Sequence, residues 1–458
     1  MTDWPALQAA IAGDVLLPGS PGYEAARKPA IARFHGIRPQ AVVRCRTPAD
    51  VSETIALARR AGLRTAARSG GHCFAGRSST EGVVIDVSPM RSVSVSGGLS
   101  TIGAGARLGD VYDARERDGL TIPGGCGPAV GIAGLTLGGG LGILGRKQGL
   151  TSDSLTAAQV VLADGRVVEC DEDRDGDLFW ALRGAGGGNL GVVTSLTFRT
   201  LQAPRATGFR LTWPHTATTA LIGAWQSWAP SAPDELAASL LVIAGGAIDR
   251  PPAVKLFGAM LGSEAELDRL LEELVARAGS EPASAFRRET AFRETKRYLA
   301  GLDGGEPSDR AHLFSRSGYF RRPLPPETVA ALLEQLGRGR GRGRGASREL
   351  DFTPWGGAYN RVPADATAFA HRGELFLLKH GVAVEPGGDG EAALRWLRQS
   401  WATVRPYGSG GVYPNFPDPE LEQAARAYYG GNLERLMRVK RSYDPDDFFR
   451  FPQSLPVG

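Results

Sequence analysis

The sequence has few cysteines, and none of them stands at a metal-binding spacing. Cys45, Cys73, Cys126 and Cys170 are scattered without a CxxC pair, and the six histidines include no HxH or HxxxH spacing. Structural zinc sites draw ligands from such short-range pairs. No metal centre is therefore predicted, and the cysteines are expected to be reduced thiols rather than a disulfide framework.

Targeting and membrane segments are missing as well. Residues 1–15 carry the acidic Asp3 and no basic region ahead of a long apolar core, so they do not resemble a signal peptide. No apolar run approaches the ~20 residues that span a bilayer. The net charge of +4 over 458 residues is too small to indicate a nucleic-acid or membrane partner. We predict a cytoplasmic protein.

Glycine, by contrast, is abundant and unevenly placed. The 62 glycines are nearly double the ordinary share of about 7%. The GRGRGRG repeat at 339–345 predicts a basic surface loop. Most of the other glycines lie in four N-terminal clusters, at 68–76, 103–109, 119–149 and 184–191.

Local patterns predict strands and helices that do not alternate regularly. Residues 47–50, TPAD, form a capping box with Pro at the first position of a helix that ends before Gly62. Asp164-Gly165, between two apolar runs, predicts a hairpin. Residues 177–184 predict a short helix and 191–200 a strand. The fold class is therefore α+β rather than a doubly wound sheet.

The chain is longer than one hydrophobic core usually grows, so two domains are expected. From about residue 205 the glycine clusters give way to strand-like and helix-like segments. The strand-like segments are 209–213, 238–243, 254–258 and 374–379, and the helix-like ones are 264–277 and 326–336. The last 45 residues return to the earlier glycine-rich and aromatic composition. We predict a first domain of 1–205 completed by 410–458, and a second domain of 206–409.

Residues 68–72, RSGGH, follow a predicted strand. Two adjacent glycines allow successive N–H groups to point into one concavity, which binds a pyrophosphate. An ordinary Gly-Gly turn is an equal alternative. His72 closes this turn, and a neutral imidazole is a nucleophile as well as an acid or base. Considered alone, such a histidine more often has a structural role.

Nine glycines between 124 and 142 predict a loop laid along an extended ligand, because each costs roughly 0.5–1 kcal/mol against Ala in a helix or strand. Cys126 lies at its start, where a thiolate could reach a bound ring; a small buried residue is the alternative. Two segments, 140–145 and 186–191, match GxGxxG. Neither is flanked by both a strand and an amphipathic helix, so we reject a Rossmann site.

Together these segments resemble the berberine-bridge-enzyme-like branch of the FAD-linked oxidases, which share the vanillyl-alcohol-oxidase (PCMH-type) fold. The motifs that carry the resemblance are RSGGHCFAGRS at 68–78, GGCGPAVGIAGLTLGGGLG at 124–142, GLTSDSL at 149–155, LFWALRGAGGGNLGVVTSL at 178–196, YPNFPD at 413–418 and the segment 428–454. The resemblance implies an FAD-binding domain of 1–205 with 410–458. It also implies a substrate domain, 206–409, in which helices cover an antiparallel sheet.

The resemblance also implies how FAD is held. His72 corresponds to the family histidine bonded to the flavin 8α-methyl group, and Cys126 to the cysteine bonded to C6, so a bicovalent FAD is expected. The other expected cofactor contacts are Arg68, Ser69, Gly70, Gly71, Gly76, Ser78, Gly125, Val130, Gly131, Gly134, Leu135, Gly138, Gly139, Gly140, Gly142, Asp153, Gly191, Val192 and Asn415.

The implied reaction transfers a hydride from a C–H next to O or N of a small molecule to flavin N5, and dioxygen then reoxidises the flavin to give peroxide. In the family's Y-x-N-Y motif this chain has Tyr413, Asn415 and, in place of the second tyrosine, Phe416. Tyr413 and Asn415 are therefore the predicted catalytic residues. Phe416, Trp355 and Tyr359 are expected to line the substrate pocket, with packing as the alternative for the last two.

Three hypotheses on function remain at this stage. An oxidase of a secondary metabolite comes first, and an oligosaccharide or hexose oxidase of the same family comes second. The third is a flavin-binding protein that has lost catalysis, which Phe416 keeps open because it has no proton to exchange.

Overall fold

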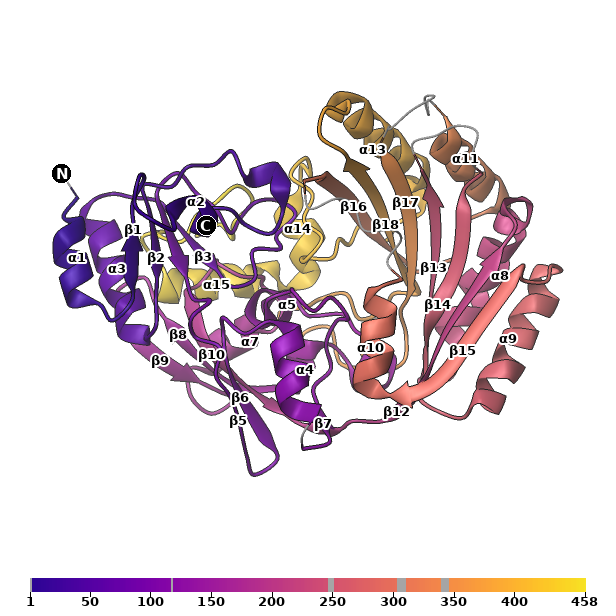
Figure 1. Ribbon diagram of the computed structural model, residues 1–458, viewed down its shortest axis with the longest axis horizontal. Coiled ribbons are helices and arrows are strands. Elements are labelled where there is room, and N and C mark those ends of the chain that lie inside the picture. The colour runs from indigo at the N-terminus through magenta and orange to yellow at the C-terminus, as the bar shows by residue number, and fades with distance from the viewer. Residues whose placement is uncertain (1, 117, 246–250, 303–309, 339–345) are drawn as a thin grey trace.

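The chain folds into two lobes that lie side by side (Figure 1). The computed structural model describes residues 2–116, 118–245, 251–302, 310–338 and 346–458, so the predicted loop at 339–345 lies outside the described part. Both termini belong to the same lobe, and the middle of the chain forms the other. The α+β class is confirmed by the sheets and helices of both lobes.

The first lobe contains a four-stranded, a five-stranded and a small two-stranded sheet. The four-stranded sheet has the order β1 (Asp14–Leu16), β2 (Ala41–Arg44), β4 (Val83–Asp86), β3 (Thr65–Arg68). The five-stranded sheet is antiparallel, in the order β5 (Val93–Ser96), β6 (Leu99–Gly103), β10 (Val192–Arg199), β8 (Leu155–Val161), β9 (Val167–Cys170). Strands β7 (Leu120–Thr121) and β11 (Leu201–Gln202) form the third sheet.

A predicted helix start and a predicted hairpin of this lobe are confirmed, and so are the local interactions that cause them. Helix α3 (Pro48–Arg60) begins at the Thr47–Asp50 capping box, in which the amide N–H of Asp50 donates to the Thr47 hydroxyl over 3.2 Å. Strands β8 and β9 form the hairpin predicted at Asp164-Gly165, and Gly165 has the positive φ of +87° that favours glycine.

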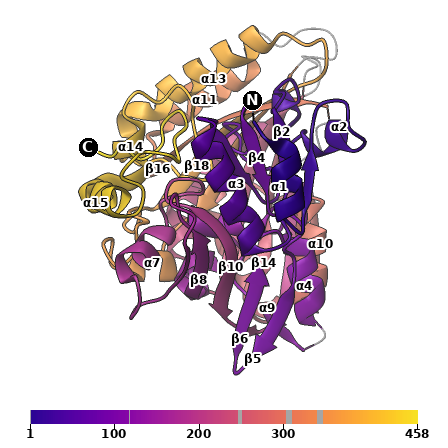
Figure 2. The same ribbon diagram turned by 90° about the vertical axis from the view of Figure 1, so that its left-hand side faces the viewer.

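The N-terminal helices of this lobe are α1 (Trp4–Ala10), α2 (Tyr23–Ala26), α3, α4 (Leu108–Glu116), α5 (Ile132–Leu137), α6 (Gly145–Gln148) and α7 (Gly176–Leu182). Helices α1 and α3 stand together at the four-stranded sheet (Figure 2), whereas α4 and α6 contact helices of the second lobe. Near the C-terminus, α14 (Ala424–Tyr429) and α15 (Leu433–Tyr443) return to the same lobe.

The second lobe is a seven-stranded antiparallel sheet with helices packed on one face (Figure 1). The strand order is β15 (Ser284–Ala291), β12 (Arg205–Trp213), β14 (Ala253–Met260), β13 (Leu236–Ala244), β17 (Ser347–Pro354), β18 (Phe376–Val384), β16 (His312–Phe320). The covering helices are α8 (Thr218–Ser231), α9 (Glu264–Ala278), α11 (Pro326–Gly337) and α13 (Gly390–Val404). Two more, α10 (Phe292–Ala300) and α12 (Ala358–Arg361), contact the first lobe.

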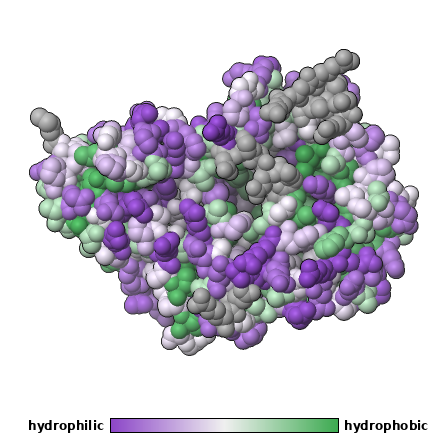
Figure 3. Space-filling view, viewed as in Figure 1, coloured by the Kyte–Doolittle hydropathy of each residue, from purple (hydrophilic) through white to green (hydrophobic). Residues whose placement is uncertain are grey.

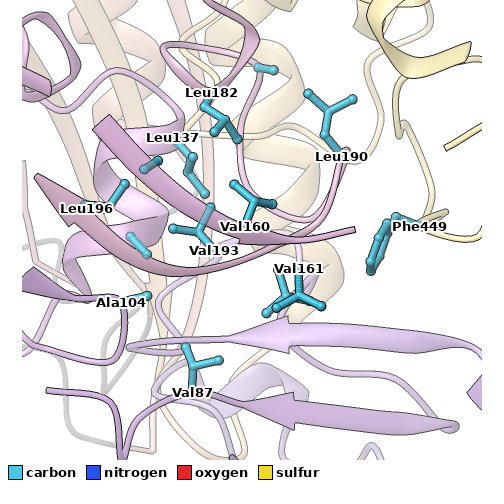
Figure 4. Packing of buried hydrophobic residues seen from close by; sticks show 14 of the residues in the cluster. Val87, Ala104, Leu137, Val160, Val161, Leu182, Leu190, Val193, Leu196 and Phe449 are labelled. Atoms are coloured by element: carbon cyan, nitrogen blue, oxygen red, sulfur yellow. The ribbon is translucent and has the colours of Figure 1, made fainter. Parts of the chain in front are cut away.

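Each lobe has its own hydrophobic core. One draws on residues 7–198 and 412–455 together with Ala368, and the other on residues 209–404. In Figure 4 the C-terminal Phe449 lies beside Val161 and Leu190 of the first lobe. The last part of the chain is therefore built into the first core.

A buried ion pair fastens this C-terminal segment. Lys440 and Asp444 are both fully buried, 2.6 Å apart, and the Lys440 ammonium also donates to the carbonyls of Asn189 and Phe449. We expect Lys440→Met to lower the free energy of unfolding by about 3–5 kcal/mol, because Asp444 would remain as a buried charge without its cation. Chemical denaturation of the full chain measures this, and Lys440→Met with Asp444→Asn should recover part of the loss. Wild-type stability in the single variant would contradict the prediction.

In Figure 3 hydrophilic side chains are spread over both lobes and apolar ones occur in small separate groups. Within the described ranges, no helix is both long and apolar enough to cross a bilayer.

Candidate functional site

The RSGGH turn packs directly against the glycine-rich segment that follows Cys126. A Cβ on Gly70 would lie 2.3 Å from the amide nitrogen of Gly131, so only glycine permits this contact, and Gly71 has φ +72°. The imidazole of His72 donates to the carbonyl of Ala129, three residues after Cys126. Both predicted attachment residues therefore lie in loops that meet at one site.

His72 has the protonation state that a nucleophile needs. Burial and the nearby Arg107 cation lower its pKa, while the hydrogen bond to Ala129 opposes this shift. The imidazole is therefore neutral at neutral pH.

Polar residues around the turn either support it or face the site. The Arg68 guanidinium donates to the carbonyls of Ser78 and Ala26, and the Ser69 hydroxyl donates to the carbonyl of Ala104. These side chains hold the loops in place. The Ser78 hydroxyl is buried and has no hydrogen-bond partner among the described residues, so it is available to a polar ligand group.

The segment 124–142 is only partly the loop that its glycines predict. Ile132–Leu137 form helix α5, with Gly134 inside it, so the expectation of a continuous loop is wrong at these residues. Ile132 and Leu137 are buried in the first core, and this packing offsets the low helix propensity of Gly134. Gly134 itself is exposed, and a Cβ there would meet no atom within 4 Å.

The C-terminal segment closes over the glycines. The Asn415 side-chain amide donates to the Leu135 carbonyl (2.9 Å) and to the Tyr413 hydroxyl (3.0 Å). That hydroxyl also accepts from the amide N–H of Gly140, and a Cβ on Gly138 would lie 2.2 Å from the Asn415 carbonyl oxygen. The two predicted catalytic residues thus fix the course of the glycine-rich segment.

Tyr413 is poorly suited to accept a proton. Burial raises its pKa to about 12, although the hydrogen bonds from Asn415 and Gly140 lower it in part. Phe416 packs edge-on against Tyr413 and Phe74, with ring centroids 5.1 and 6.0 Å apart. It therefore lies beside the His72 loop.

Trp355, Tyr359 and Asp153 are engaged with the protein. The rings of Trp355 and Tyr359 stack with centroids 4.3 Å apart, and the Tyr359 hydroxyl donates to the Gly142 carbonyl. Both are buried, so the geometry favours the packing alternative. The Asp153 carboxylate accepts two hydrogen bonds from the buried Arg372 guanidinium.

The sheet face without the covering helices points toward the first lobe. At one end, Phe257 and Ala259 of β14 pack in a cluster with Cys126. At the other end, Leu377 of β18 packs in a cluster with Tyr413. Side chains on this sheet face that lie between the Cys126 cluster and the Tyr413 cluster are therefore at the boundary of the two lobes.

A polar row crosses this face, and sequence reasoning missed it. Successive cross-strand partners are Lys255, Leu241, Asp351, Lys379 and Ser317. The Lys379 ammonium lies 3.0 Å from Glu349, 3.5 Å from Asp351 and 5.3 Å from the ring centroid of Phe416. The signal in the sequence is the alternation in SRELDFTP at 347–354, which places polar residues at every second position of a strand.

Asp351 has an electrostatic environment suited to a base. Burial raises the pKa of its carboxyl, and the Lys379 cation lowers it by less. A base works best when its pKa approaches the working pH.

A cavity of about 1050 Å³ lies elsewhere, with Arg316, His371 and Glu374 among its lining residues. It contains none of the predicted site residues. Among the described residues, no group of three or more His, Cys, Asp or Glu side chains is placed to hold a metal ion.

Comparison with known proteins identifies the family of this chain. The FAD binding domain family matches residues 39–171, and the family described as berberine and berberine like matches residues 412–456. The chain is 34% identical to the uncharacterized FAD-linked oxidoreductase YvdP of Bacillus subtilis, over 97% of this chain and 98% of that protein. It is 31% identical to the chitooligosaccharide oxidase of Gibberella zeae, over 91% of this chain and 87% of that protein.

Two further matches widen the range of relatives. The chain is 32% identical to the aclacinomycin-N/aclacinomycin-A oxidase of Streptomyces galilaeus, over 93% of this chain and 86% of that protein. A solved structure of chitooligosaccharide oxidase matches with a TM-score of 0.88 at 26% identity, and 99% of each chain is covered.

The fold and these matches define an FAD-linked oxidoreductase with a PCMH-type flavin-binding fold. The chain belongs to the berberine-bridge-enzyme-like family of FAD-linked oxidases, which confirms the resemblance seen in its motifs. It is an enzyme that uses FAD. The open space at Gly134, where a Cβ would meet no atom within 4 Å, and the Ser78 hydroxyl, which has no partner among the described residues, fit a polar cofactor.

Proposed function

We propose that this oxidase carries FAD bonded to both His72 and Cys126, in an FAD-binding domain of 1–205 and 410–458. The observation that carries this proposal is the meeting of the two loops, in which the His72 imidazole donates to the carbonyl of Ala129, close to Cys126. The bound flavin supplies the hydride acceptor N5, and dioxygen regenerates it with release of hydrogen peroxide. Residues 206–409 form the substrate domain.

Asp351 is the proposed proton acceptor for the substrate's heteroatom. Phe416 has no exchangeable proton, and Tyr413 remains protonated at neutral pH. Asp351 lies on the sheet face between the lobes and has a raised pKa. The Lys379 ammonium lies 3.5 Å from this carboxylate and 5.3 Å from the ring centroid of Phe416, and its charge favours the ionised form of Asp351.

The polar face favours a hydroxyl-rich substrate. Besides the charges of Glu349, Asp351 and Lys379, the face carries the Ser315 and Ser317 hydroxyls, which are buried and have no partner among the described residues. Unsatisfied buried hydroxyls are matched by a ligand that offers hydrogen bonds at several points. This observation favours the oligosaccharide or hexose hypothesis over the secondary-metabolite hypothesis.

A substrate panel tests this proposal. Hexoses, oligosaccharides and apolar alcohols are offered to the purified enzyme, and peroxide release and oxygen uptake are recorded. We expect the highest kcat/KM for an oligosaccharide. A flavin that stays oxidised with every compound would instead favour a flavin-binding protein without catalysis. Flavin reduction without oxygen uptake would indicate a dehydrogenase.

The acid limb of the pH profile tests the proposed base. Asp351 accepts a proton only when it is ionised, so kcat/KM should fall as the pH drops through its pKa. Because burial raises that pKa above the ordinary 3.8, the fall should begin at a higher pH than for an exposed aspartate. In Asp351→Asn the residual activity should lose this limb. An unchanged limb in that variant would contradict the assignment.

A further inference from the structure

Lys296 is a buried lysine that connects the second lobe with the loop carrying Cys126. It lies on α10, which stands between the lobes (Figure 1), and only 2% of its surface is exposed. Its ammonium donates to the carbonyls of Gly124 (2.7 Å) and Gly125 (3.2 Å), the two residues before Cys126. Burying an ammonium ion is unfavourable unless its surroundings favour the charge. Groups in and around the loop must therefore stabilise the buried charge of Lys296.

Aromatic side chains complete the surroundings of this ammonium. The nitrogen lies 3.7 Å from the ring centroid of Tyr112 and 5.0 Å from that of Phe292, distances at which a ring face attracts a cation. The Tyr112 hydroxyl also donates to the Gly125 carbonyl over 2.8 Å. The backbone before Cys126 is thus held by α4 of one lobe and by α10 of the other.

Cys126 is the group whose charge complements Lys296. Burial lowers the pKa of Lys296 to about 7, and a negative charge on Cys126 opposes that shift. Because the attraction is mutual, the ammonium favours the thiolate of Cys126 over its thiol. The thiolate is the reactive form of a cysteine.

We propose that Lys296 is a positioning residue for the attachment of FAD to Cys126, holding the 124–126 loop and stabilising the attacking thiolate. This inference rests on the proposed link between Cys126 and flavin C6. In the net reaction the S–H and C6–H bonds break and the S–C6 bond forms. Two electrons and two protons pass to dioxygen, which is reduced to hydrogen peroxide.

The test uses full-length His72→Ala protein, in which retained FAD reports on the Cys126 link alone. FAD is added in air, and the fraction of denatured protein that carries one FAD mass is followed over time. We expect Lys296→Met in this background to gain the FAD mass at least ten-fold more slowly. Arg297→Met, which removes an exposed charge from the next position of α10, should leave the rate unchanged.

A second background separates this effect from a general loss of structure. In Cys126→Ala protein, where FAD is held through His72, adding Lys296→Met should leave the retained FAD mass unchanged. Loss of FAD in that background, or an unchanged rate in His72→Ala with Lys296→Met, would overturn the assignment. If His72→Ala with Lys296 intact never gains FAD, the Cys126 link itself fails, and this inference fails with it.

Discussion

Intact-mass measurement under denaturing conditions is expected to show one FAD mass on the wild type, on His72→Ala and on Cys126→Ala, and none on the double variant. A covalent bond survives denaturation, whereas hydrogen bonds from the glycine-rich loops do not. Each residue lies in one of two loops that pack together at Gly70 and Gly131, as two links to the same ring require. Loss of FAD in His72→Ala alone would make Cys126 a bystander.

A matched control is available next to the site. Cys73 follows His72 directly and, like Cys126, is half-buried. Cys73→Ala should keep both links, and it should also keep FAD when combined with His72→Ala. Loss of FAD in that combination would move the thioether from Cys126 to Cys73. A wild type without retained FAD would contradict covalent attachment altogether.

The second large effect is expected for the polar row of the seven-stranded sheet. Asp351→Asn should lower the rate of flavin reduction by substrate about 10²–10⁴-fold, the usual contribution of a positioned base. Asparagine has the same shape and cannot accept the proton. Anaerobic stopped-flow measurement of flavin bleaching isolates this step from reoxidation by dioxygen.

Glu349→Gln is the appropriate control for that variant. Glu349 lies two positions away on the same strand and pairs with the same lysine over 3.0 Å, but its cross-strand partner is Gly381 rather than Lys379. We expect less than about a ten-fold effect from it, since only an indirect electrostatic contribution is lost. Equal losses in both variants would indicate that the two carboxylates act only through their charge on Lys379, and that Asp351 is not the base. Full activity in Asp351→Asn would exclude it as the base.

The local elements were predictable because their causes are contiguous in the chain. The capping box at Thr47–Asp50 and the Asp164-Gly165 turn each fix a few backbone dihedrals through neighbouring residues. The strands and helices of the second lobe follow from apolar periodicity over short segments, as in β12 and α9. The helix at Ile132–Leu137 escaped prediction because burial of its apolar side offsets an unfavourable glycine.

The candidate functional residues also divide into those that the sequence predicts and those that only the tertiary structure shows. The sequence by itself determined the class of cofactor, and it predicts His72 and Cys126 as attachment residues, because the contiguous motifs around them resemble those of the family. Only the tertiary structure decided that Lys379 lies between Asp351 and Phe416, and that Lys296 contacts the loop before Cys126. Their position depends on the register of the seven-stranded sheet and on the packing of α10 against the first lobe. A one-residue shift of register would turn Asp351 into the helix-covered core, and no local pattern specifies which face meets the flavin loops.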